Sequence, residues 1–535
     1  MRTSDYEIDF ERLIADISQI LGAMHKTANS PKFWDRILGY WLLNFLDVAF
    51  VEWDATSNEP RQSRSVEISK HPKLEQVPRQ TRRKSELLDA SQHQGWRAQL
   101  FEDALNYRTG RPFFLKQPLA GSSQKSSNRD TRREIVRRFL RPIMWSIFCR
   151  QKYVLATSYL SPAANTALAL RLRSLPTRWI EPAIQEASFS LELREKVRQD
   201  LFVEPGRSFE GFVRAVIAFY LPKSLVEEFA DIAQCVGNSN SRFPKVIFSA
   251  NLHFSSDVFA HWLATQTENG SVLLISQHGG LNGQGVIPSN DEVVERKIAD
   301  GYCNWGWTSS STDVRIPAQV NVWTRRRRNF RENGRVILMS DATFRFKRRI
   351  STDSSRYKEH VLDTYDSIPE KMRCLTTVRL HRDHDRYDES HRVIWANRFP
   401  SALIDDGLSP IRNLYKTEKL FVCTTLGTTE IECFGRNIPA ILSLDPVLHK
   451  VREDFSDLLN ELQRVGLAHL SKESLRNFLE SNVDDLGGWW TSEEVQGAVS
   501  RYMHKYGFMP ARPVAHIASV LRDAARSKSA RLSDD

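Results

Sequence analysis

Apolar residues recur at three- and four-residue spacing through the first part of the chain, a pattern that predicts amphipathic helices. The first helix would carry its apolar side at Phe10, Leu13, Ile14, Ile17, Ile20 and Leu21. Residues 32–50 are strongly apolar and aromatic, and we interpret them as core rather than as a site. Polar segments at 55–93 and 117–133 are typical of loops or weakly ordered insertions. Residues 1–150 are therefore predicted to be a helical N-terminal region that forms part of a first lobe.

From residue 151 the pattern changes to short β-rich runs that alternate with helices, which predicts a parallel sheet with crossover helices. The strands of this first α/β lobe, residues 151–320, are expected at 152–158, 245–250 and 271–276. Ser161 and Pro162 have the residue types of a helix N-cap and first helical position. Residues 300–307 are expected to close this lobe.

A basic stretch at 321–334 is predicted to be a linker, after which the α/β pattern restarts as a second lobe at 335–470. Its strands are expected at 335–339, 374–380, 420–424 and 438–444. Helices should follow at 471–525, and residues 526–535 should be a frayed tail. The predicted fold class is thus α/β, with two doubly wound Rossmann-type lobes that face a cleft at the carboxyl ends of their strands.

The bulk composition agrees with two lobes, because 535 residues exceed what one core accommodates. Hydrophobic residues make up 41% of the chain, enough to build packed interiors. The first twenty residues contain acidic side chains and lack the apolar core of a signal peptide. The longest apolar stretch, near 139–159, is interrupted by charged residues and falls short of the roughly 20 that a membrane span needs. We therefore expect a cytoplasmic protein, with the inner face of the cytoplasmic membrane as the alternative.

The formal charge of +10 fits three kinds of partner: nucleic acid, an anionic membrane surface, or an anionic substrate. The densest basic runs, at 82–84, 325–328 and 345–349, are short and do not alternate with aromatic residues. No RRM, KH or zinc-finger signature is present, so a nucleic-acid partner is not expected. The six cysteines form no C-x-x-C pair and are expected to be reduced thiols.

A glycine-rich turn follows the predicted strand at 271–276 and contains Gln277, His278, Gly279 and Gly280. Glycines let backbone amides approach a phosphate or a sugar, and an imidazole can accept a hydroxyl proton. The simpler alternative is a tight turn whose histidine bonds a neighbouring carbonyl, but the four glycines of 279–285 at a strand end favour a functional site.

Carboxylates follow in a predicted helix at 291–300, where Glu292 and Glu295 fall on one face and Asp300 begins the next element. A carboxylate near His278 would orient the imidazole or act as the base for an acceptor hydroxyl. The alternative is an ordinary solvated acidic helix.

A third candidate is the strand, loop and helix start at 424–432, which contains Thr428, Thr429 and Glu432. Amides at a helix N-terminus form an anion site that suits a nucleotide phosphate, and Glu432 could bind ribose hydroxyls. Thr429 and Glu432 also have the spacing of a capping box, which needs no ligand.

The fourth candidate lies at the end of a second-lobe strand, where Arg379 or His381 could meet donor phosphates. The nearby His and Asp residues match no familiar ligand spacing, so no metal is expected. No Walker A loop, H-E-x-x-H, G-x-S-x-G or kinase motif is present.

Taken in order, these motifs resemble those of the LIC12162-type transferases that are found with O-antigen gene clusters. The resemblance lies in Gln277 to Gly280, Glu295, Asp300, Trp305 to Trp307, Arg379-Leu380, Thr428 to Glu432, Asn437 to Pro439 and Trp489-Trp490. The N-terminal pair Tyr40-Trp41 and the segment 222–229 are also similar to this family. The chain departs from the family pattern at 384–387, where the family would have a Tyr-Gly-type stretch after Arg379-Leu380, so the resemblance does not identify the donor sugar.

The resemblance implies a GT-B-like glycosyltransferase that builds surface polysaccharide such as O-antigen or capsule, without a metal and without a cofactor, since the nucleotide sugar is a substrate. The second lobe would hold the donor, and the first would present His278, with Glu295 or Asp300, to a lipid-linked or glycan acceptor. Two alternatives remain open: a polyol-phosphate transferase of the teichoic-acid type, and a non-catalytic protein that binds a nucleotide or a glycan.

Overall fold

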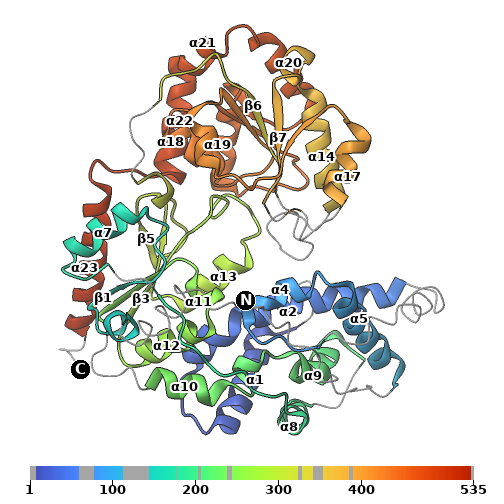
Figure 1. The fold of residues 1–535 in the computed structure, drawn as a ribbon, viewed down its shortest axis with the longest axis vertical. Helices are drawn as coiled ribbons and strands as arrows, with labels where there is room; N and C mark the ends of the chain where they lie inside the picture. Colours follow the sequence, from blue (N-terminus) through green and yellow to red (C-terminus); the bar gives the residue numbers. More distant parts are fainter. Residues whose placement is uncertain are drawn as a thin grey trace, which may run out of the picture.

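The computed structural model describes residues 8–58, 78–111, 144–176, 179–202, 207–237, 244–322, 328–341, 354–382, 384 and 390–531. These residues form a helical N-terminal region, a first α/β lobe and a second α/β lobe, in that order along the chain (Figure 1). The predicted loop at 117–133 and the basic run at 345–349 lie outside the described residues.

The first sheet is entirely parallel and follows chain order, β1-β2-β3-β4-β5. Its strands are β1 (Tyr153–Leu155), β2 (Val246–Ser249), β3 (Val272–Ser276), β4 (Gly301–Asn304) and β5 (Asp313–Arg315). The sequence predicted β1 to β3 and missed the short β5. Because the described strands show no reversal of order, this sheet lacks the switch point that a doubly wound sheet has.

Helices cover both faces of the first sheet (Figure 1). The crossover helices α12 (Asp257–Glu268) and α13 (Asn290–Ile298) pack against the long apolar helix α2 (Pro31–Asn58), which confirms its predicted place in the core. Helix α7 (Pro162–Arg171) packs against the C-terminal helix α23 (Pro513–Arg531). The Ser161 side chain is the N-cap of α7 and accepts a hydrogen bond from the Ala164 amide. Further helices described in this half include α1 (Phe10–His25), α4 (Leu87–Ala90), α5 (Gln94–Thr109), α8 (Leu191–Leu201), α9 (Phe209–Tyr220), α10 (Phe229–Gly237) and α11 (Leu252–Ser255).

The second sheet is also parallel, with the order β11-β10-β9-β6-β7-β8. Its strands are β6 (Val336–Met339), β7 (Thr376–Arg379), β8 (Leu403–Asp405), β9 (Leu420–Cys423), β10 (Ala440–Ser443) and β11 (Ala468–His469). The order reverses between β6 and β9, which is the doubly wound arrangement and the usual place for a ligand. The helices of this lobe are α14 (Ser354–Ser367), α15 (Glu370–Arg373), α17 (Ser390–Arg398), α18 (Thr429–Gly435) and α19 (Glu453–Arg464).

The C-terminal helices tie the two lobes together. Helices α20 (Lys472–Asn482), α21 (Leu486–Thr491) and α22 (Glu493–Tyr506) belong to the second lobe, and α22 packs against α18 and α19. Helix α23 (Pro513–Arg531) then returns to the first lobe and packs against α7, β2 and β3 (Figure 1). The predicted fraying from 526 is wrong for residues 526–531, because the helix continues through them.

A single hydrophobic core continues from the N-terminal helices through the first sheet into the second lobe. It includes Leu38 and Ile275 on the first-lobe side and Phe421 and Ile431 on the second. Alternate residues of a strand face opposite sides of a sheet, so on β6 Ile337 joins this shared core while Val336 and Leu338 join a separate core on the other face.

The ends of the predicted linker are packed on the second lobe. Asn321 donates to the Ile431 carbonyl at 2.8 Å, and the Arg328 guanidinium donates to the carbonyls of Tyr415 and Glu418. Residues 323–327 lie outside the described residues. The fold class is confirmed as α/β with two parallel sheets that share a cleft.

Candidate active site

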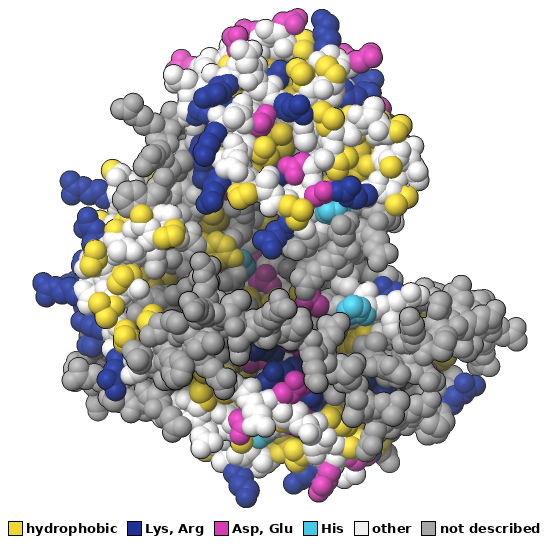
Figure 2. Space-filling model, in the orientation of Figure 1, with side chains coloured by type: hydrophobic (Ala, Val, Ile, Leu, Met, Phe, Trp, Pro, Cys, Tyr) yellow, Lys and Arg dark blue, Asp and Glu magenta, His cyan; other side chains and the backbone are white. Residues whose placement is uncertain are grey.

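The carboxyl ends of strands from both sheets border one cleft of about 470 Å³, a size typical of small-molecule sites. The surface is visibly hollowed between the two lobes (Figure 2). Its first-lobe wall is formed by His278, Gly279, Gly280, Leu281 and Asp291. The second-lobe wall includes Ser340, Asp341, Arg379, His381, Thr424, Thr425, Gly427, Thr428, Thr429, Glu430 and His449. The structure thus brings two segments into one cleft: the turn at 277–285, which we call the histidine turn, and the loop at 424–429, which we call the threonine loop.

His278 follows β3 directly and lies between two carboxylates. Its Nδ1 is 3.4 Å from Glu295 Oε1, and its Nε2 is 3.7 Å from Asp291 Oδ2. Both carboxylates come from helix α13, whose N-terminus is capped by Ser289. Residues 291 and 295 are one turn apart, so they lie on the same side of that helix.

Glu295 is completely buried behind the imidazole. The same oxygen, Oε1, is 3.7 Å from Nε2 of His253, and burial lowers the pKa of His253 to about 3. His253 is therefore neutral near neutral pH and is not a cationic partner for Glu295.

Asp300 is not part of this site, which corrects the sequence prediction. It precedes β4 and lies at the amino end of the sheet, whereas the cleft is at the carboxyl end. Its carboxylate accepts from the Leu273 amide at 2.8 Å and pairs with Lys32 at 2.9 Å. Although burial opposes ionisation, these bonds hold the pKa of Asp300 below its usual value, so the residue is structural.

Gln277, predicted to bind the donor, is buried beneath the turn and does not line the cleft. Its Nε2 donates to the Gly279 carbonyl at 2.7 Å. Its Oε1 accepts from the Trp305 amide and from the Trp307 indole at 3.2 and 2.9 Å. The Trp-Gly-Trp segment therefore fixes the shape of the histidine turn.

The backbones of the two loops touch at Gly280 and Gly427. A Cβ atom added to Gly280 would lie 1.4 Å from the Gly427 carbonyl oxygen, so only glycine fits there. A buried hydrogen-bond chain connects the same loops. Gln284 donates to the Gly280 carbonyl at 3.0 Å and contacts the Tyr502 hydroxyl, which donates to Glu430 Oε1 at 3.2 Å. Backbone bonds between residues 284–286 and 450–452 join the lobes beside this chain.

The threonine loop carries hydroxyls and amides into the cleft. The glutamate that lines the cleft beside this loop is Glu430, whereas the sequence predicted Glu432. Glu430 lines the cleft and accepts from the Gly427 amide at 2.7 Å. Glu432, predicted to bind ribose, points elsewhere, because positions two apart on a helix face different sides. It accepts from the Tyr415 hydroxyl at 2.6 Å and pairs with Arg436 at 3.2 Å. The predicted capping box of Thr429 and Glu432 is not formed.

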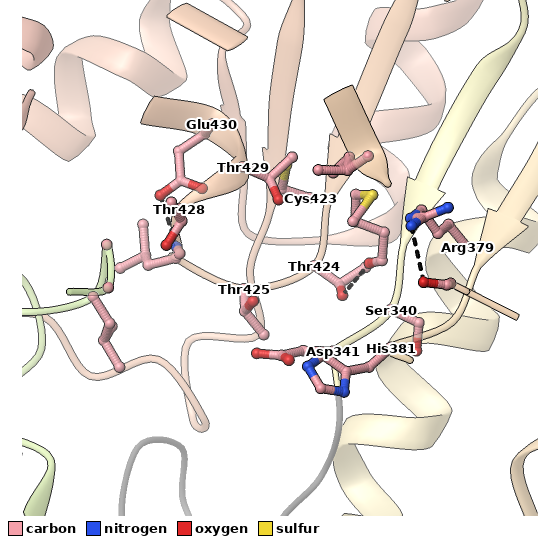
Figure 3. A pocket seen from close by; sticks show the side chains of 18 of the residues that line it. Ser340, Asp341, Arg379, His381, Cys423, Thr424, Thr425, Thr428, Thr429 and Glu430 are labelled. Carbon is pink, nitrogen blue, oxygen red and sulfur yellow. Dashed lines mark hydrogen bonds between the residues drawn. The ribbon is translucent and has the colours of Figure 1, made fainter. Parts of the chain in front are cut away.

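Arg379 borders the cleft, but its guanidinium is used within the lobe. It pairs with Asp405 and donates to the carbonyls of Gly407 and Ser409, so it shapes the loop after β8 instead of offering a free fork to a phosphate. His381 and Asp341, from the ends of β7 and β6, line the same wall (Figure 3).

Two cleft residues, Asp341 and His449, lie outside every predicted motif. Three more, Asp291, Thr425 and Glu430, lie within predicted motifs but were not predicted as site residues. Asp291 could have been found, because it is one turn from Glu295 on the same predicted helix. His449 follows β10 with no local motif. Its Nδ1 donates to the Asp445 carbonyl at 3.1 Å, which leaves Nε2 as an acceptor, and burial lowers its pKa to about 4.

Within the described part of the chain, no three His, Cys, Asp or Glu residues are grouped so that they could hold a metal ion. Likewise, none of the described helices combines the length and hydropathy needed to cross a membrane.

The two lobes and their shared cleft make this a GT-B-like α/β protein. Sequence comparison is more specific: the chain belongs to the LIC12162 family of transferases, whose profile matches residues 6–521. No curated protein matches the sequence.

Several solved structures share parts of the fold at low similarity. MnaA of S. aureus, in a co-structure with UDP, is 13% identical over 58% of this chain and 85% of its own, with a TM-score of 0.35. MurG of Acinetobacter baumannii is 11% identical over 69% and 98%, with a TM-score of 0.33. WaaG, a glycosyltransferase of lipopolysaccharide biosynthesis, is 10% identical over 69% and 98%, with a TM-score of 0.32. These likenesses are too distant to indicate a substrate.

Proposed function

We propose that this transferase moves a sugar from a nucleotide-activated donor to a hydroxyl group of a surface-polysaccharide acceptor, such as O-antigen or capsule. One observation carries the proposal: a single cleft has an imidazole backed by a buried carboxylate on one wall and a hydroxyl-rich turn on the other. The acceptor, lipid-linked or glycan, would approach from the first lobe, and the donor would lie on the second. We expect the reaction to occur on the cytoplasmic side of the membrane.

On the acceptor side, His278 would act as general base. With its Nδ1 proton directed at Glu295, Nε2 carries a lone pair and can take the proton of an acceptor hydroxyl. The acceptor oxygen then bonds to the anomeric carbon as the bond from that carbon to the phosphate oxygen breaks. The proton ends on His278, and the electron pair leaves with the nucleoside phosphate.

On the donor side, the loop from Thr425 to Thr429 would receive the leaving phosphate with its amides and hydroxyls. Gly279 and Gly280 approach from the opposite wall. The absence of a side chain at Gly280 lets this wall reach the Gly427 backbone, and Gly279 beside it would face the donor. Arg379 would act indirectly by holding the loop after β8 in place. His381 remains a candidate donor ligand, whereas Gln277 and Glu432 are assigned no contact.

Mutations can distinguish Glu295 from Asp300, the two carboxylates that the sequence offered as partners of His278. Glu295→Gln keeps the volume but removes the charge that orients His278, and we expect transfer to fall by about a hundredfold. Asp300→Asn, which removes charge at the amino end of the sheet, should leave kcat near the wild-type value. Equal losses in the two variants, measured by steady-state kinetics on folded protein, would contradict this assignment.

Nucleotide affinity should depend on pH through Glu430. Burial raises the pKa of this carboxyl to about 8, so it is neutral near neutral pH and gains a negative charge as the pH rises through that value. The new charge beside the threonine loop would repel a phosphate, and we expect affinity to fall by about fivefold. Calorimetric titrations from one unit below to one unit above this pKa should show the fall in the wild type and a flat profile in Glu430→Gln.

Two measurements test the proposed function: which nucleotide or nucleotide sugar binds the protein, and what mass the product has. A panel of nucleotides and nucleotide sugars, screened by thermal shift, should contain a stabilising compound. Incubation with that donor and an acceptor extract should give a product heavier by one sugar, and a chelator should not stop the reaction. A phosphopolyol increment would indicate the teichoic-acid-type reaction instead, and binding without any turnover would indicate a non-catalytic protein.

A further inference from the structure

Two leucines project into solvent at the end of helix α7 and in the turn that follows it. Leu170 is 65% exposed and Leu175 is 59% exposed, whereas Leu172 and Ser174 between them are buried. Two exposed arginines, Arg171 and Arg173, alternate with them along the chain. We call this region, together with the basic residues described next, the leucine–arginine surface.

Neighbouring elements add more positive charge to this surface. Helix α23 packs against α7, and its exposed Arg522 donates to the Arg171 carbonyl. Arg526 lies one turn further along α23, where it pairs with Asp523 at 3.4 Å. On the other side, the Leu175 amide donates to Gln151 at 3.0 Å, which places exposed Lys152 close by.

The pairing of exposed apolar and basic side chains indicates which kind of partner fits. Large exposed leucines favour burial in an apolar environment, whereas a nucleic acid would be met by basic and aromatic side chains. Arginines and lysine around them are attracted to anionic lipid headgroups, and both features together are typical of proteins that rest on a bilayer. Figure 2 shows Lys and Arg side chains mixed with hydrophobic ones along the left edge of the molecule, where Figure 1 places α7 and α23.

We propose that the leucine–arginine surface docks this protein on an anionic lipid bilayer. The leucines enter the boundary between headgroups and acyl chains, and the basic residues pair with the headgroups around them. The docking stands on its own observations and does not depend on the proposed sugar transfer. If both hold, docking would keep the enzyme close to a lipid-linked acceptor.

Vesicle binding tests the proposal with the full chain. Wild-type protein should co-sediment with vesicles of phosphatidylcholine and phosphatidylglycerol, bind vesicles of phosphatidylcholine alone much more weakly, and be released by salt. The double variant Arg171→Glu/Arg173→Glu should lose about twentyfold or more in affinity, since each basic residue near the surface contributes about fivefold. Leu170→Ser/Leu175→Ser should lose about tenfold or more.

A matched control carries the same change of charge elsewhere. Arg464→Glu/Arg476→Glu alters two exposed arginines of the second lobe and should bind the vesicles as the wild type does. All variants should keep the wild-type melting temperature and its nucleotide-induced shift, so a failure of docking is distinguishable from a failure of the proposed function. Equal binding to both vesicle types, unchanged binding by both surface variants, or binding to RNA without binding to vesicles would overturn the proposal.

Discussion

Replacing His278 by alanine is expected to lower the rate of sugar transfer by about a thousandfold. Among the described groups of the first-lobe wall, the imidazole is the one that can accept a hydroxyl proton and also lies 3.4 Å from a buried carboxylate. The nucleotide should still bind, because its proposed contacts lie on the second lobe. Single-turnover assays would separate the loss of chemistry from any change in donor affinity.

The control for this variant is His504→Ala, which removes an exposed imidazole from helix α22. It should retain full activity and the wild-type melting temperature. Undiminished transfer by His278→Ala would remove this residue from the mechanism and leave Asp291, 3.7 Å away, as the candidate base.

Replacing Gly280 by alanine should have the largest effect on the architecture of the cleft. The added methyl would lie 1.4 Å from the Gly427 carbonyl oxygen, and this neighbour is backbone that cannot rotate away. The two loops must separate, which we expect to cost about 1–3 kcal/mol of unfolding free energy or more. Nucleotide binding should be lost as well, because both walls of the phosphate region move.

Gly237→Ala is the matched control, because nothing lies within 4 Å of a Cβ added at that helix end. Thermal melts and nucleotide titrations on both variants would check the prediction. If Gly280→Ala binds the nucleotide as the wild type does, the contact between the loops does not shape the donor site.

Local sequence signals were sufficient for most of the fold. The buried runs before Gln277 and before Thr424 form β3 and β9, since continuous apolar runs are typical of strands covered on both faces. β4 lies in the segment 300–307, which was expected only to close the first lobe. Three further strands that were not predicted, β5, β8 and β11, are only two or three residues long, and β5 and β8 are not fully buried. Their apolar patterns are too brief to be recognised.

The site was predictable as a region but not residue by residue. The turn at His278 and the loop at Thr428 were identified because glycines and threonines at strand ends carry a local meaning. Distinguishing Glu295 from Asp300 requires knowing that Glu295 reaches His278 from helix α13, whereas Asp300 precedes β4 at the amino end of the sheet. Glu432 was the predicted ligand, but on helix α18 it faces away from the cleft, and Glu430, two positions earlier, lines it. The role of Arg379 depends on Asp405, the last residue of β8, and on Ser409 in the loop after it, both distant from Arg379 in the sequence.

The hydrophobic core that continues between the lobes has a consequence for engineering. A chimera that exchanges one half for that of a relative treats each half as an independent module. Here such a chimera would join mismatched apolar surfaces and mismatched loops at Gly280 and Gly427. New specificity in this scaffold is therefore better sought by changing side chains within the groove than by recombining whole halves.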